Sequence, residues 1–123
     1  MDKKETGQFG ENLAIQYLQK KGYKILDKNF TYFSRQGKKF GEIDIVAEKE
    51  GIIVFFEIKT QKENKYFDPS ERINSKKIKR MQNLAEIWLR KHRLGGRPFE
   101  IDLITILLDF ENKKAKIEHF KNI

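Results

Sequence analysis

The spacing of apolar side chains divides the chain into two helical stretches and five strand-like stretches. Apolar residues recur every three to four positions in residues 3–21 and 75–92, which is the period of an amphipathic helix. Short apolar or alternating runs, typical of strands, occupy 23–34, 41–47, 52–60, 99–109 and 114–120. This order, α-β-β-β-α-β-β, predicts one α/β domain over residues 1–123, with a central mixed sheet flanked by two helices.

The first predicted helix carries an apolar stripe with a carboxylate at its border. The stripe consists of Phe9, Leu13 and Tyr17, widened by Ala14 and Leu18. Glu11 lies on the same side as Ala14 and Leu18. A carboxylate in such a place is either a long side chain reaching out to solvent from the edge of the core or part of a polar site. The pattern leaves both interpretations open.

The strands over 41–47 and 52–60 read as a hairpin whose far end is charged. If Lys49 and Glu50 form a two-residue loop, Asp44 lies opposite Phe55 and diagonal to Glu57, on one face of the sheet. Glu57 and Lys59 share that face because strand side chains alternate. The opposite face is apolar throughout, formed by Ile43, Ile45, Ala47, Val54, Phe56 and Ile58. Charged groups inside an apolar hairpin are costly unless they are paired, hydrated or bound to a metal ion.

The context of Glu57-Ile58-Lys59 makes this triplet informative. With 12 Glu and 20 Lys, the chain has three Glu-x-Lys triplets, where about two are expected by chance. Only this one follows a run with the character of a buried strand, Ile52 to Phe56. Two carboxylates can bind Mg²⁺ or Mn²⁺, and a neighbouring lysine can act on the attacking water or offset developing charge. The alternative is a structural ion pair between one carboxylate and a lysine.

Charge and composition narrow the classes of function. The chain has no Cys and two His, which argues against disulfides, a thiolate nucleophile and a His-rich metal site. No apolar run is long enough for a membrane span, so we expect a cytoplasmic location. Residues 59–97 contain 12 Lys or Arg and four Asp or Glu, while the rest of the chain has 14 of each. The whole excess of +8 therefore lies in one segment, which favours a polyanionic partner over general solubility.

Part of this charge lies at the start of the second predicted helix, after a predicted loop over 61–72. The first turns carry Lys76, Lys77, Lys79 and Arg80. Cations at a helix start oppose the helix dipole, and together with the terminal N–H groups they can bind phosphate. The alternative is a solvated basic face on which the unfavourable dipole interaction is tolerated.

Several motifs resemble one known family. The segments Gly7–Ala14, Gly41–Val46 and Phe56–Thr60, with Asn29 and the final Ile117–Asn122, are similar to the bacterial YraN-like family. That family is related to Holliday-junction resolvases within the PD-(D/E)XK nuclease superfamily.

The resemblance implies a restriction-endonuclease-like fold and assigns roles to particular residues. Asp44 and Glu57 would be metal ligands, Lys59 the catalytic lysine, Glu11 a further site residue and Lys77 a supporting cation. The sequence departs from the pattern at Ile43, where the superfamily has Pro, and at Gln61, where relatives often have Arg. The segment Thr31–Phe40 is also longer.

These features together predict metal-dependent hydrolysis of nucleic-acid phosphodiesters, with structured DNA, such as branched or flapped DNA, the favoured substrate and Mg²⁺ or Mn²⁺ the cofactor. The alternatives are a nucleic-acid-binding module with the same fold and little catalysis, and an interaction protein whose basic helix meets an acidic partner. The oligomeric state is open, a homodimer included.

Overall fold

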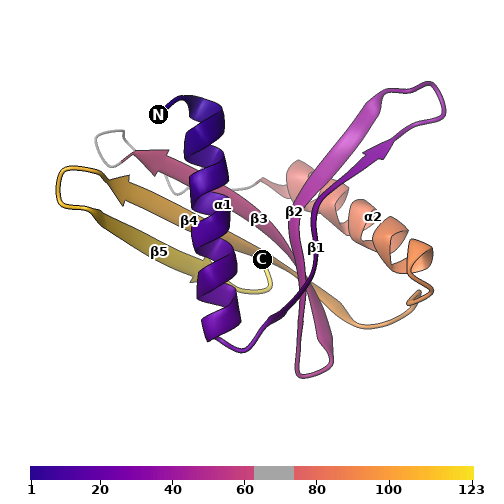
Figure 1. Cartoon of the computed structure of the whole chain (residues 1–123). Helices are drawn as coiled ribbons and strands as arrows, with labels where there is room; N and C mark the ends of the chain where they lie inside the picture. The colour runs from indigo at the N-terminus through magenta and orange to yellow at the C-terminus, as the bar shows by residue number, and fades with distance from the viewer. Residues whose placement is uncertain (63–73) are drawn as a thin grey trace.

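The computed structural model describes residues 1–62 and 74–123. Two helices, α1 (Lys3–Lys20) and α2 (Ser75–Lys91), lie on opposite faces of a five-stranded sheet (Figure 1). The strands are β1 (Lys24–Phe33), β2 (Lys39–Lys49), β3 (Ile52–Lys62), β4 (Phe99–Asp109) and β5 (Lys114–Phe120). The predicted element order and the single α/β domain are confirmed. The predicted loop over 61–72 lies outside the described residues, apart from Gln61 and Lys62, which extend β3.

The sheet has the order β1-β2-β3-β4-β5 and is mixed, as predicted. Neighbouring strands run antiparallel except for β3 and β4, which are parallel and joined by way of α2. A parallel pair needs a long crossover connection, and α2 provides it. Its N-cap is Asn74, whose side chain accepts a hydrogen bond from the Lys77 N–H at 2.8 Å.

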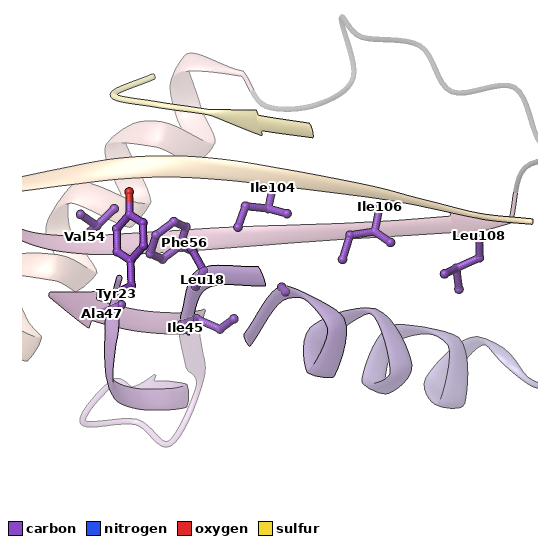
Figure 2. Close-up of a cluster of buried hydrophobic side chains, with 10 residues drawn as sticks. Leu18, Tyr23, Ile45, Ala47, Val54, Phe56, Ile104, Ile106 and Leu108 are labelled. Atoms are coloured by element: carbon purple, nitrogen blue, oxygen red, sulfur yellow. The ribbon is translucent and has the colours of Figure 1, made fainter. Parts of the chain in front are cut away.

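Each face of the sheet has its own core. The α1-side core consists of Ala14, Leu18, Tyr23, Ile45, Ala47, Val54, Phe56, Ile104, Ile106 and Leu108 (Figure 2). The α2-side core consists of Ile43, Val46, Ile53, Phe55, Met81, Leu84, Ala85, Trp88, Leu89 and Ile101. Burial of both faces explains why β3 and β4 read as continuous apolar runs rather than as alternating ones.

Three details of the sequence prediction are corrected. The first concerns the β2–β3 hairpin, in which Lys49 pairs with Ile52 and the loop is Glu50-Gly51. Both loop residues have positive φ, 52° and 80°, which is the geometry of the tight turn that matches strand twist. The register therefore shifts by two residues from the predicted one. A shift of two residues does not by itself exchange the faces of the sheet.

The second correction concerns Ile43, which packs in the α2-side core rather than with Ile45. Strand β2 leaves β3 beyond the Ile45–Phe56 pair and continues with β1 alone, so its first half faces α2. Figure 1 shows this divergence as two arms that separate above the β2–β3 turn.

The third correction concerns the buried line of α1. Phe9 is exposed, and the buried positions are Thr6, Gly10, Ala14 and Leu18. The helix rests on its smallest side chains because it lies close to β3. A Cβ atom on Gly10 would come within 1.9 Å of the Thr60 hydroxyl oxygen.

A buried polar network fixes the end of the chain to the sheet and to α1. Asp102 of β4 is fully buried, and its Oδ2 lies 2.7 Å from Nε2 of His119 on β5. The Asn122 N–H donates to Asp102 Oδ1 at 2.9 Å. Nδ1 of His119 lies 3.2 Å from the Tyr17 hydroxyl of α1. Every partner of the buried carboxylate is thus a hydrogen-bonding group, as burial of a charge requires.

Candidate functional site at the fork of the sheet

The candidate site lies where β2 separates from β3. The last pair between these strands is Ile45–Phe56, although β2 continues back to Lys39 and β3 runs on to Lys62. A cleft of about 640 Å³ occupies the fork. It is lined by the first turns of α1, by Asp44 and by β3 from Glu57 to Lys62. All four predicted catalytic residues, Glu11, Asp44, Glu57 and Lys59, line this cleft.

Asp44 marks the point of separation. Continuing the hairpin register by one residue would set Asp44 opposite Glu57, but the strands part there, and Asp44 Oδ2 instead accepts the Ile58 N–H at 2.8 Å. Burial raises the pKa of the Asp44 carboxyl to about 7, and the negative charge of Glu57 adds to the rise. The Ile58 hydrogen bond opposes it. A carboxyl with a strongly raised pKa in a cleft is a recurring property of functional sites.

Glu57 is held by a lysine from the second helix. Its side chain is 13% exposed, and its Oε1 lies 2.5 Å from Nζ of Lys77, in the first turn of α2. The ion pair between a carboxylate and a lysine, which the sequence allowed as the alternative to a metal site, is therefore present, with Lys77 as the cation. Lys77 reaches the site from the first turn of α2, which lies on the face of the sheet opposite α1 (Figure 1).

Lys59 and Glu11 reach the cleft from β3 and α1. Lys59 lies two residues beyond Glu57 on β3 and is partly buried. Burial raises the pKa of the Glu11 carboxyl, and a hydrogen bond from the Asn29 side chain opposes the rise. Asn29 has φ of 55°, a left-handed conformation that Asn tolerates better than most residues. The border position predicted for Glu11 is thus a place in the cleft.

Sequence reasoning missed part of the lining. Lys3, Thr6 and Gly7 of α1 and Thr60 and Gln61 of β3 also face the cleft. No local pattern could bring the start of α1 to the end of β3, because that contact is tertiary. Gly10 could have indicated this contact, since a glycine inside a helix is unfavourable unless another chain segment packs closely against it.

The four cations in the first turns of α2 divide into two groups. Lys77 is partly buried and binds Glu57, whereas the other three are exposed. These three, Lys76, Lys79 and Arg80, are called the basic cluster below. The Lys77 N–H at the helix start is bonded to the Asn74 side chain and is one of the terminal amides already satisfied within the chain. The exposed cations remain available to a polyanion.

The donor set suits a hard divalent cation with few protein ligands. Within residues 1–62 and 74–123, no three His, Cys, Asp or Glu side chains are grouped closely enough to hold a metal ion by themselves. Asp44 and Glu57 could contribute two carboxylates, and Asp44 uses only Oδ2 for its hydrogen bond. Mg²⁺ commonly binds through one or two carboxylates and keeps several waters or substrate oxygens.

Comparison with known proteins gives one consistent result. The profile of Uncharacterised protein family UPF0102 matches residues 10–106, which include every candidate site residue. The chain belongs to the UPF0102 family. A UPF0102 protein of Syntrophomonas wolfei is 38% identical over 119 residues, covering 97% of this chain and 96% of that protein.

Two further relatives cover the chain as completely. A UPF0102 protein of Caldicellulosiruptor bescii is 38% identical over 123 residues, covering 99% of this chain and 98% of its own length. A UPF0102 protein of Clostridioides difficile is 37% identical over 122 residues, with coverage of 99% and 98%. Family membership thus extends over the whole fold. Neither α1 nor α2 is long and apolar enough to cross a membrane.

Proposed function

We propose that this protein is a metal-dependent nuclease that hydrolyses phosphodiester bonds of nucleic acid, with DNA the favoured substrate. One observation carries the proposal: Asp44, Glu57 and Lys59 line a single cleft at the fork of the sheet. Two carboxylates and a lysine on neighbouring strands are the parts that this hydrolysis needs. Their arrangement agrees with the sequence resemblance to the PD-(D/E)XK superfamily.

Asp44 and Glu57 would hold Mg²⁺ or Mn²⁺ in this cleft. The bound cation would supply Lewis-acid stabilisation of the phosphoryl group and would activate the attacking water. The raised pKa of Asp44 is consistent with such a role, because burial and the negative charge of Glu57 disfavour the ionised carboxyl, which a bound cation would stabilise.

Charged side chains around the cleft would stabilise the remaining negative charge of the substrate and exchange protons with water. Lys59, beside Glu57 on β3, would offset the negative charge that develops on the phosphoryl oxygens. Glu11, with a raised pKa and a place across the cleft, could exchange a proton with a water that enters there. Lys77, which bonds to Glu57 Oε1, would release this oxygen to the cation and remain beside the site as a supporting positive charge. The basic cluster would bind the backbone on either side of the cleaved bond.

Cleavage assays on single variants test this proposal. Wild-type protein with Mn²⁺ should cleave labelled DNA. Glu57→Gln should abolish the activity, and Lys59→Ala should lower the rate by about 10² or more while leaving the melting temperature nearly unchanged.

Glu48→Gln is the matched control. Glu48 lies on β2 and pairs with Arg97 at 3.4 Å, outside the cleft. It should keep full activity. Wild-type-like cleavage by Glu57→Gln would refute the assigned site, since the reaction would then not need this carboxylate.

The Lys77–Glu57 ion pair favours a second candidate, a nucleic-acid-binding module that keeps the fold without catalysis. In that case Glu57 holds α2 on the sheet through Lys77 and does not bind a cation. Removing Lys77 would leave the Glu57 carboxylate, whose side chain is 13% exposed, without its partner. Lys77→Met should then destabilise the fold by about 3 kcal/mol or more, and Mn²⁺ should not compensate. If Glu57 holds a cation, Mn²⁺ should restore much of the stability of this variant.

A further inference from the structure

The outer halves of β1 and β2 form a two-stranded arm that leaves the rest of the sheet. Pairing between β1 and β2 continues to Phe33–Lys39, well past the last β2–β3 pair at Ile45–Phe56. We call residues 30–43 the β1–β2 arm. In Figure 1 it rises away from β3, β4 and β5 and ends in the turn over residues 34–38. The arm ends next to Asp44, the residue of β2 that lines the cleft.

The tip of the arm exposes two large aromatic side chains. Phe33 is 56% exposed and Phe40 is 39% exposed, and they flank the turn on its two strands. The Tyr32 ring meets Phe40 edge-on, with ring centroids 6.2 Å apart. The inner part of the arm is different, because Phe30 and Tyr32 pack against the α2-side core. Folding thus accounts for the inner aromatics, whereas Phe33 and Phe40 keep large exposed areas, Phe40 despite its edge-on contact with Tyr32.

The charge of the arm selects the kind of partner. The arm, residues 30–43, contains Arg35, Lys38 and Lys39 and one carboxylate, Glu42. Glu42 is paired with Lys39 at 3.2 Å, so the net positive charge of the arm comes from Arg35 and Lys38. Exposed aromatic rings beside cations suit a polyanion that also presents flat apolar faces. Unpaired nucleotides have both properties, since their bases stack on aromatic rings and their phosphates bind cations.

The position of the arm links it to the cleft. Phe40 lies four residues from Asp44 along β2, which corresponds to about 13 Å in an extended strand. A nucleic-acid strand advances about 3.4 Å per nucleotide when stacked, so this distance spans about four nucleotides. Next to Phe40, the Arg80 side chain packs against Gly41, which brings the basic cluster to the arm.

We propose that the β1–β2 arm binds unpaired nucleotides next to the cleaved bond by stacking bases on Phe33 and Phe40. Arg35 and Lys38 contact the adjacent phosphates. The inference rests on the proposed function and adds the substrate class: nucleic acid with a single-stranded segment about four nucleotides from the reacting phosphate. A fully paired duplex has no exposed base faces along its length and gains nothing from the two rings.

Binding measurements on the full chain, with chelator present to prevent cleavage, test the arm. The probes are a blunt DNA duplex and the same duplex with a single-stranded tail that contains 2-aminopurine. Phe33→Ala/Phe40→Ala should weaken binding to the tailed probe about tenfold or more, and binding to the blunt duplex by less than about twofold. The change in 2-aminopurine fluorescence on binding, which reports stacking, should also be lost.

Two further variants separate stacking from other effects. Phe33→Leu/Phe40→Leu keeps apolar bulk but removes the rings, and it should show the same loss. Phe110→Ala is the matched control, because Phe110 is 46% exposed at the other end of the sheet, after β4. It should bind both probes like the wild type.

The arm and the proposed function fail in different ways. If Phe33→Ala/Phe40→Ala binds the tailed probe like the wild type while Glu57→Gln still abolishes cleavage, only the arm proposal is overturned. If the wild type binds neither probe, both are overturned. A homodimer that the double alanine variant dissociates, with unchanged affinity for DNA, would assign the two rings to a second copy of the chain.

Discussion

Replacing Asp44 by Asn should stabilise the metal-free protein at pH 8 and much less at pH 5. The pKa of Asp44 is raised from 3.8 to about 7, mainly by burial and then by the charge of Glu57. A raised carboxyl pKa means that the folded protein holds this proton more tightly than the unfolded chain. The associated stability is fully present below pH 3.8 and is lost as the pH rises to about 7.

The magnitude follows from the two pKa values. One pKa unit corresponds to about 1.4 kcal/mol, so the ionised Asp44 lowers the free energy of unfolding by at most about 4 kcal/mol at pH 8. At pH 5 the same calculation gives about 1.6 kcal/mol. The Asn side chain has no charge and its amide oxygen can still accept the Ile58 N–H bond. The stability difference between variant and wild type should therefore grow by about 3 kcal/mol from pH 5 to pH 8.

Urea unfolding at both pH values, with chelator present, measures this difference. Glu48→Gln is the control, because it removes a carboxylate from the same strand outside the cleft. Adding Mn²⁺ at pH 8 should then stabilise the wild type more than Asp44→Asn. A stability difference between Asp44→Asn and the wild type that does not change with pH would refute the reasoning. It would mean that the folded protein does not disfavour the ionised form of Asp44.

Two further changes test the packing and the charge around the cleft. Replacing the three cations of the basic cluster by Gln should weaken DNA binding and reduce the slope of log K against log salt by up to about 3. The control variant, with Gln at Lys113, Lys114 and Lys116, should keep the wild-type affinity and slope. An unchanged slope in the basic-cluster variant would place the phosphate contacts elsewhere. Gly10→Ala should lower the free energy of unfolding by about 1–3 kcal/mol, because its methyl group would overlap Thr60. Thr60→Gly in the same chain should recover part of the loss, and equal stability of Gly10→Ala and the wild type would contradict this contact.

Most of the secondary structure could be predicted because each element is long and has a clear apolar period. Strands β4 and β5 have the predicted bounds, and α2 differs by one residue. The hairpin register could not be fixed in this way, because Lys49-Glu50 and Glu50-Gly51 are both acceptable loops by composition. The glycine at the second loop position favoured the observed turn, which needs positive φ at both residues.

The candidate site was partly predictable for a similar reason. Alternation along a strand is enough to put Asp44, Glu57 and Lys59 on one face, and a register shift of two does not alter it. The fork between β2 and β3, the approach of α1 at Gly10 and the pairing of Lys77 with Glu57 all depend on tertiary contacts. Residues 20 apart in sequence, such as Glu57 and Lys77, leave no local pattern that shows their contact.

The location of a bound Mn²⁺ ion tests the central claim most directly. Anomalous diffraction from crystals soaked in Mn²⁺ should show the ion in the cleft, coordinated by Asp44 and Glu57, with Lys77 moved away from Glu57 Oε1. The ion should be lost in crystals of Glu57→Gln. A soaked crystal in which the Lys77–Glu57 pair is intact and the cleft contains no Mn²⁺ would contradict the account.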